Sequence, residues 1–161
     1  MYSRHLCACY VVVYKGVVAG EVKKVLTNGC FDPFHVGHLY YLQAARKLGD
    51  VLIVAVTMDE YVDKGPGRPA FSLNERMDIL RALAIVDEVI AVQNGLEAVK
   101  MVRPDVYAKG REYEGRLPEQ DLVEFYGGRV VFTETPRYSS TEILNGSHLQ
   151  VRSARCGRWD H

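Results

Sequence analysis

The chain has 161 residues, the length of one globular domain with enough material to bury a sizeable core. Its 20 basic and 20 acidic side chains cancel to a formal net charge of zero, which excludes a field of one sign over the whole molecule. We therefore expect neither nucleic acid nor a membrane as a partner, and any anion-binding site must be local.

Cysteine usage and the N-terminal apolar run both bear on the compartment. The cysteines are Cys7, Cys9, Cys30 and Cys156. They are few and irregularly spaced, which favours reduced thiols over disulfides or a zinc site. The apolar run at residues 6–19 is too short to span a bilayer, and the residues before it make a poor signal peptide. We therefore expect a cytoplasmic protein.

The chain divides into three parts by composition. Residues 1–21 form an N-terminal extension that could add a strand at residues 10–14. Residues 22–146 carry the regular pattern of the main domain. Residues 147–161 form a basic C-terminal tail, for which we expect a frayed helix or disorder.

Short apolar runs alternate with helical periodicity through the main domain. Strands are expected at residues 22–27, 51–57, 88–92, 106–108 and 130–133. Helices are expected at residues 36–48, 72–83, 96–102 and 118–126, with another beginning at 139–141. This order predicts an α/β fold with a single Rossmann-like, doubly wound, five-stranded parallel sheet and helices on both faces.

The loop after the first strand carries the strongest functional signal. Residues 27–38 read T-N-G-C-F-D-P-F-H-V-G-H, and we expect a helix to begin near Pro33. His35 and His38 would then share one helix face, because positions three apart are neighbours, and Gly37 between them leaves room for a ligand. The unpaired N–H groups of a helix N-terminus suit a phosphate group. The motif therefore predicts nucleotide chemistry.

Further candidate loops follow the carboxyl ends of other strands, at residues 57–69, 109–116 and 134–140. Ligands of doubly wound sheets bind at that end, so we expect all these loops to share one site. Three of their side chains suit a phosphorylated acceptor, because they can pair with phosphate or stack: Lys109, Arg111 and Tyr113. A plain solvated loop is the alternative.

The glycine- and proline-rich loop also carries Lys64 and Arg68. These side chains could close over a bound triphosphate as a lid, or simply keep the loop soluble. Ser139, Ser140 and Thr141 would cap the last expected helix, where their hydroxyl groups could also donate to phosphate.

With these residues in place, the chain from about residue 23 to residue 144 resembles the nucleotidyltransferase superfamily defined by H-x-G-H, and within it the cytidylyltransferase-like branch. The match to the adenylyltransferase domain of bifunctional ADP-heptose synthases is the most extensive. It covers T-N-G-x-F-D-x-x-H-x-G-H at 27–38, A-R-K-L-G-D at 45–50 and K-G-x-x-R-P at 64–69. Glycerol-3-phosphate cytidylyltransferases are similar in architecture.

The resemblance implies attack by an acceptor phosphate on the α-phosphorus of a nucleoside triphosphate, with release of pyrophosphate. The implied catalytic residues are His35, His38, Arg46, Ser140 and Thr141, with Lys47 as an alternative to Arg46. The implied nucleotide-binding residues are Thr27, Asn28, Gly29, Phe31, Asp32, Gly37 and Ser139. Phe31 could equally be a core residue, and Asp32 would order the loop.

Several features of the reaction stay open. The resemblance implies ATP with a heptose 1-phosphate-like acceptor, CTP with glycerol 3-phosphate or a related phosphate as the competitor, and a lapsed nucleotide-binding sensor as a third possibility. It also implies Mg²⁺ carried by the triphosphate rather than by a protein metal site, and a homodimer. The loop K-G-R-E-Y at 109–113 and Glu134 depart from the family patterns, which leaves the acceptor in doubt.

Overall fold

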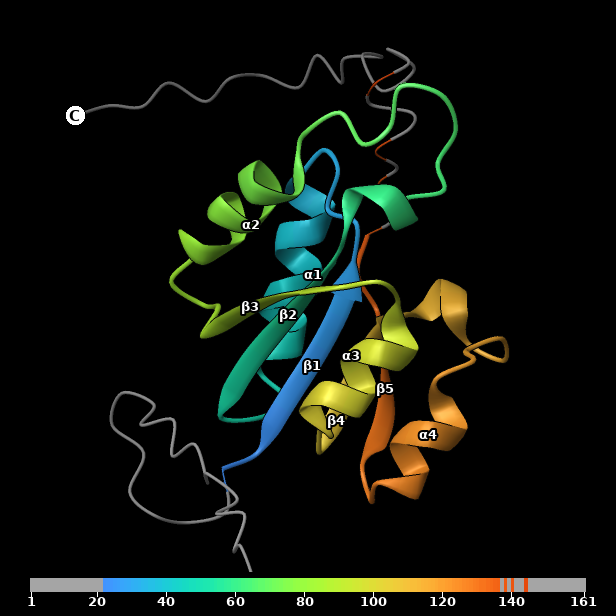
Figure 1. The fold of residues 1–161 in the computed structure, drawn as a ribbon. Coiled ribbons are helices and arrows are strands. Elements are labelled where there is room, and N and C mark those ends of the chain that lie inside the picture. The colour runs from blue at the N-terminus through green and yellow to red at the C-terminus, as the bar shows by residue number, and fades with distance from the viewer. Residues whose placement is uncertain (1–21, 137, 139, 141–143, 145–161) are drawn as a thin grey trace, which may run out of the picture.

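The computed structural model describes residues 22–136 together with 138, 140 and 144 (Figure 1). Its strands form one sheet in the order β3-β2-β1-β4-β5, and every neighbouring pair is parallel. The strands are β1 (Lys24–Gly29), β2 (Val51–Thr57), β3 (Glu88–Val92), β4 (Val106–Gly110) and β5 (Arg129–Thr133). The helices are α1 (Val36–Arg46), α2 (Leu73–Arg81), α3 (Gly95–Val102) and α4 (Gln120–Phe125), with 3-10 turns η1 (Asp59–Tyr61) and η2 (Arg111–Tyr113). The expected doubly wound α/β fold is confirmed.

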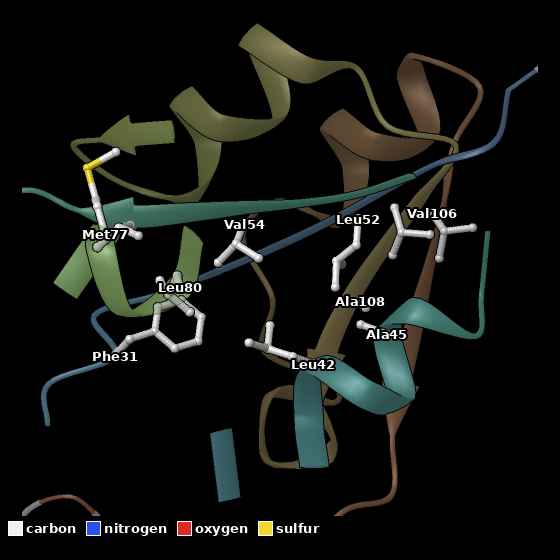
Figure 2. Packing of buried hydrophobic residues seen from close by; sticks show 11 residues of the cluster. Phe31, Leu42, Ala45, Leu52, Val54, Met77, Leu80, Val106 and Ala108 are labelled. Atoms are coloured by element: carbon white, nitrogen blue, oxygen red, sulfur yellow. The ribbon is translucent and has the colours of Figure 1, made fainter. Parts of the chain in front are cut away.

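The two faces of the sheet carry separate apolar cores. Alternate residues of β1 point to opposite faces, so Val25 joins one cluster and Leu26 the other. The first cluster receives side chains from α1 and α2, among them Leu42 and Leu80 (Figure 2). The second receives Val99 of α3, together with a residue of α4. Helices therefore cover both faces, as right-handed crossovers between parallel strands require.

Strand β2 lies inside the sheet and is buried along its whole length. Its register pairs Lys24 with Val51 on one side and Ile53 with Glu88 on the other. Burying each valine, leucine or isoleucine side chain contributes about 1.5–3 kcal/mol. The apolar run from Val51 to Thr57 therefore anchors the sheet, as its sequence predicts.

The strand order reverses at β1. The chain moves outward from β1 through β2 to β3, and then returns to place β4 on the other side of β1. Crossovers leave in opposite directions at this point, so a crevice opens above the carboxyl ends of β1 and β4. Gly29 and Gly110 end these two strands.

Two expected strand ends at this edge were wrong. Strand β1 continues through Asn28 and Gly29, which pair with Ala55 and Val56 instead of forming a turn. Strand β4 likewise continues to Gly110 beside β5, so Lys109 belongs to a strand and not to a loop. Helix α1 begins at Val36, as the helix expected over 36–48 does, and not already near Pro33. Local residue preferences could not reveal the neighbouring strands that extend these ladders.

The remaining boundaries differ by a few residues. Helix α2 has the expected capping box, in which Ser72 and Glu75 bond to each other's backbone N–H. Helix α4 begins at Gln120, two residues after the expected Pro118. Within the described residues, no helix has the length and apolar character needed to cross a membrane. The possible strand at 10–14, the tail at 147–161, Ser139 and Thr141 lie outside the described residues.

Candidate active site

A cavity of about 300 Å³ lies at the carboxyl ends of β1 and β4, where the strand order reverses. Residues from five segments line it: Asn28, Gly29, Cys30, Phe31, Gly37, His38, Tyr41, Thr57, Lys64, Lys109, Gly110, Glu112, Tyr113, Thr135, Pro136 and Tyr138. Eight of the residues singled out in the sequence are therefore brought together. They are Asn28, Gly29, Phe31, Gly37, His38, Lys64, Lys109 and Tyr113.

His35 is the N-cap of α1 and begins the site. Its backbone is extended, with φ −147° and ψ 172°, so the helix cannot start before it. Its Nδ1 accepts from the N–H groups of Gly37 at 3.1 Å and His38 at 3.4 Å. An imidazole thus performs the capping role that serine, threonine, aspartate or asparagine usually has. Since Nδ1 is an acceptor, a neutral His35 ring carries its hydrogen on Nε2.

His38 completes the same capping box and faces the cavity. Its Nδ1 accepts from the His35 backbone N–H at 3.3 Å, and the two rings stack with centroids 3.8 Å apart. Burial, with smaller effects of His35 and Lys64, lowers the pKa of His38 to about 3. The ring is therefore neutral at pH 7 and carries its hydrogen on Nε2. His38 can act there as a neutral hydrogen-bond donor to an anion.

The space beside Gly37 is filled by an aromatic ring. A Cβ at Gly37 would lie 2.8 Å from two atoms of Tyr138 and 3.0 Å from the His35 ring. Glycine therefore allows Tyr138 to pack against the start of α1, where the sequence suggested room for a ligand. Phe31 lies on the other side of His38, edge-on at 5.1 Å, and is also part of the apolar core. Phe31 is therefore a core residue that also lines the cavity.

Asp32 and Arg68 form a buried ion pair beside the motif loop, with Arg68 Nε 2.8 Å from Asp32 Oδ2. The Asp32 carboxylate also accepts from the backbone N–H groups of Ala70 and Phe71. Burial opposes its charge, but the hydrogen bonds from Arg68 and from this backbone leave the pKa of Asp32 below its usual value. Arg68 therefore ties the glycine-proline loop to the motif loop and is not among the residues that line the cavity.

Arg76 is a buried side chain that sequence analysis did not select. It is 1% exposed and donates to the carbonyl oxygens of Phe71 at 3.0 Å, Cys30 at 2.5 Å and Thr57 at 2.8 Å. It also pairs with Asp59 at 2.6 Å. One guanidinium thus joins the loops that follow β1 and β2 to α2. A basic residue at the core-facing position of an amphipathic helix is the signal that could have revealed it.

Lys109 occupies the opposite side of the cavity. It is 6% exposed, and its Nζ lies 2.5 Å from Asn28 Oδ1 and 3.5 Å from the Asn28 carbonyl oxygen. The ammonium also lies 4.5 Å from the centre of the Tyr113 ring, a cation–π arrangement. Burial lowers the pKa of Lys109, although Glu119 and Glu112 oppose that shift.

Several expected site residues lie elsewhere. Arg46 is in the last turn of α1 and donates to Gly49 O at 2.9 Å, about 12 Å along the helix axis from His38. Arg111 pairs with the exposed carboxylates of Glu114 and Glu134 instead of lining the cavity. Neither side chain lines the pocket, because Arg46 lies too far along α1 and Arg111 is paired with carboxylates outside the pocket.

Two other expected residues are buried beside the cavity. The Thr27 side chain is fully buried in β1, and its hydroxyl has no hydrogen-bond partner in the part of the chain that the structure describes. Ser140 is buried as well, and its Oγ donates to the Pro33 carbonyl oxygen at 3.4 Å. This bond places Ser140 against the motif loop.

The cavity is rich in donors for an anion. Lys64, Lys109 and His38 line it, with Glu112 as its carboxylate. Among the described residues, no group of three or more histidine, cysteine, aspartate or glutamate side chains could hold a metal ion. The arrangement can therefore bind a phosphorylated molecule through hydrogen bonds and positive charge.

Comparison with known proteins agrees with this arrangement. The family model described as cytidylyltransferase-like matches residues 26–146. A protein named bifunctional protein HldE from Syntrophotalea carbinolica is 47% identical over 114 residues, which are 66% of this chain and 23% of the relative. The HldE protein of Pseudomonas savastanoi pv. phaseolicola is 45% identical over 131 residues, 78% of this chain and 28% of the relative. The chain thus spans about a quarter of the length of these curated relatives.

Solved structures show the same fold. The lipopolysaccharide core biosynthesis protein of Thermoplasma volcanium superimposes with a TM-score of 0.58 at 30% identity, covering 73% of this chain and 99% of that protein. Pantoate-beta-alanine ligase of Francisella tularensis, complexed with beta-gamma ATP and beta-alanine, gives a TM-score of 0.60 at 15% identity, covering 80% and 67%. The second likeness shows the fold alone. The resemblance inferred from the H-x-G-H motif is confirmed: this chain belongs to the cytidylyltransferase-like family of nucleotidyltransferase enzymes.

Proposed function

We propose that this protein transfers AMP from ATP to a sugar phosphate or polyol phosphate, with a heptose 1-phosphate-like acceptor, and releases pyrophosphate. The observation that carries the proposal is the cavity at the strand reversal. There, His38 at the start of α1 and Lys109 of β4 line one pocket, and the His35 ring stacks on that of His38 although His35 is not among the lining residues. The names of the relatives, HldE and lipopolysaccharide core biosynthesis protein, favour a sugar phosphate as the acceptor.

The reaction forms one P–O bond and breaks another. An acceptor phosphate oxygen attacks the α-phosphorus, and the bond from that phosphorus to the bridging oxygen of pyrophosphate breaks. The attacking phosphate is already anionic at pH 7, so positioning and charge stabilisation suffice without a strong general base. His35 and His38 donate from Nε2 to the phosphate oxygens as charge shifts toward pyrophosphate.

The two remaining cations divide between the reactants in this proposal. Lys64 is exposed in the glycine-proline loop and also lines the cavity, and it would pair with the triphosphate. Lys109 and Tyr113 would receive the acceptor phosphate on the other side. Mg²⁺ would be carried by the oxygens of the triphosphate, which the donor-rich lining of the cavity suits, and would neutralise part of their charge. We also propose that the protein is cytoplasmic and forms a homodimer. Light scattering of the purified protein would test the dimer.

The activity is tested by measuring pyrophosphate release from each of ATP, CTP, GTP and UTP with Mg²⁺. The acceptor panel is heptose 1-phosphate, glycerol 3-phosphate and ethanolamine phosphate, and the His38→Ala protein is the matched negative control. We expect ATP with the sugar phosphate to give the highest kcat/KM. Preference for CTP with glycerol 3-phosphate would replace the adenylyl reaction by the cytidylyl reaction. Tight nucleotide binding without release from any pair would indicate a sensor and overturn the proposal.

A further inference from the structure

A chain of hydrogen-bonded polar groups runs from Lys109 through Asn28, which also lines the cavity, to the buried Tyr107. Asn28 Oδ1 accepts from Lys109 Nζ at 2.5 Å and from the Tyr107 hydroxyl at 2.6 Å. The Tyr107 side chain is fully buried, on the face of the sheet that α3 and α4 cover. One amide oxygen therefore joins the ammonium that lines the cavity to a phenol behind it.

Glu119, immediately before α4, lies near the Tyr107 hydroxyl. Glu119 is 9% exposed and makes no side-chain capping bond to α4, although it occupies the N-cap position. Its Oε2 is buried and has no hydrogen-bond partner among the described residues. A buried carboxylate oxygen without a donor is costly, so its retention beside a buried ammonium points to an electrostatic role.

Gly95, the first residue of α3, makes room for this arrangement. A Cβ at Gly95 would lie 2.0 Å from Glu119 Oε1 and 2.8 Å from the Tyr107 hydroxyl. These two oxygen atoms are therefore neighbours, at most about 5 Å apart by the sum of the two distances. Any side chain at position 95 would displace one of them, so the start of α3 is shaped around the pair.

Lys109 is surrounded by groups that act on its charge from every side. Glu119 lies behind it, Glu112 and Tyr113 lie on η2, Cys30 follows β1, and Tyr107 is two residues away on β4. Burial lowers the pKa of Lys109, and the negative charge of Glu119 is the largest effect that opposes this. Among the described residues, Glu119 makes no hydrogen bond to the ammonium, and the single Tyr107 hydroxyl hydrogen is donated to Asn28, so the carboxylate acts on Lys109 through space. The Lys109 ammonium therefore remains available to the cavity that it lines.

We propose that Glu119 and Tyr107 are positioning residues that hold Lys109 protonated and aimed at the phosphate of the acceptor. This inference rests on the proposed function, and it assigns recognition of the acceptor phosphate to one buried ammonium. A direct Lys–Glu pair would neutralise the ammonium and turn it from the cavity. A carboxylate that lies behind the ammonium without bonding to it supports the charge through space and leaves the outer face for a ligand, while the Tyr107 hydroxyl holds Asn28 in place.

The kinetic test uses Glu119→Gln, which keeps the shape and removes the charge, and Tyr107→Phe. We expect Glu119→Gln to raise KM for the acceptor about 10-fold, equivalent to about 1.4 kcal/mol, with KM for the nucleotide unchanged. The alkaline limb of kcat/KM for the acceptor should move to lower pH, because Lys109 loses its proton more readily. Tyr107→Phe should raise the acceptor KM by a smaller factor. Glu124→Gln on the exposed face of α4 is the matched control.

A double mutant separates positioning from structural support. In the Lys109→Met background, Glu119→Gln should cause no further rise in acceptor KM, because no ammonium remains to be held. An equal effect in both backgrounds, or an unchanged pH profile in Glu119→Gln alone, would contradict the proposal.

A measurement independent of turnover distinguishes this inference from the proposed reaction. NMR of lysine-labelled protein follows the titration of Lys109, identified by its loss in Lys109→Met. We expect its pKa to fall in Glu119→Gln and to stay in Glu124→Gln. That result without activity toward any acceptor would reject the reaction and keep the coupling. An unmoved Lys109 pKa in an active enzyme would reject the coupling alone.

Discussion

Two buried cations differ in how fully their hydrogen bonds are used: Lys109 lines the cavity, and Arg76 bonds to the backbone of Cys30 and Thr57, which line it. Arg76 is surrounded by three carbonyl oxygens and one carboxylate, all between 2.5 and 3.0 Å. Within the described residues, Lys109 has Asn28 as its one hydrogen-bonding partner and otherwise faces aromatic rings and the cavity. A saturated cation holds loops together, whereas an unsaturated one retains capacity for a ligand. Burial alone does not separate structural from functional charges.

Replacing Arg76 by methionine tests the structural half of this comparison. Three carbonyl oxygens and Asp59 would lose their partner, and we expect the free energy of unfolding to fall by about 3 kcal/mol. Denaturant unfolding measures the change. Arg81→Met is the matched control, since Arg81 lies on the same helix with its side chain 53% exposed. Equal stability of the Arg76 and Arg81 variants would show that the buried guanidinium does not hold the loops.

Replacing Lys109 by methionine tests the functional half. We expect kcat/KM to fall about 100-fold, a typical loss for one donor to a reacting anion. Stability should be unchanged or higher, because a buried charge with few partners costs desolvation energy. Steady-state kinetics and thermal unfolding together check this, with exposed Lys100→Met as the control. Loss of stability with normal kinetics in the folded fraction would make Lys109 equivalent to Arg76.

The pH dependence of stability tests whether His38 is buried as a neutral donor. The folded ring takes up a proton only near pH 3, against 6.5 for an unperturbed ring, so the unfolded state binds more protons between these values. Stability should therefore fall as the pH drops through this window, with about 1 to 2 kcal/mol from His38 between pH 7 and pH 5. The His38→Gln variant should lack this pH-dependent contribution to the free energy of unfolding. The difference in that free energy between the wild-type protein and the variant should therefore change with pH. Parallel pH profiles for both proteins would contradict the assignment.

The smallest effect is expected at the rim. Arg111 pairs with Glu134 and Glu114 in solvent, with its side chain 63% exposed. We expect Arg111→Ala to change stability by under about 0.5 kcal/mol and acceptor kcat/KM by less than about threefold. Steady-state kinetics of Arg111→Ala and Lys109→Met, measured side by side, test this difference in acceptor kcat/KM. A loss in Arg111→Ala as large as that in Lys109→Met would show that Arg111 contacts the acceptor.

The candidate site shows why sequence reasoning reached some residues and missed others. The H-x-G-H pattern places His35 and His38 together because i, i+3 spacing is a local property. Arg76 donates to Cys30, which precedes it by 46 residues. Glu119 lies near Tyr107, whose hydroxyl donates to Asn28, 91 residues before Glu119. No local pattern reveals such partners. Arg68 and Arg111 carry suitable charges, yet each pairs with a carboxylate from another segment instead of lining the cavity.

Strand and helix alternation, the doubly wound class, the paired histidines and the family could all be predicted from the amino-acid sequence, because periodicity and short motifs are local. Tertiary packing was needed to show that β1 and β4 extend far enough to bring Asn28 beside Lys109, and that Tyr138 covers Gly37. The tertiary structure also shows that Arg76 joins loops, whereas Lys109 faces the cavity. That difference depends on which acceptors surround a charge in space, which is set by the packing of distant segments.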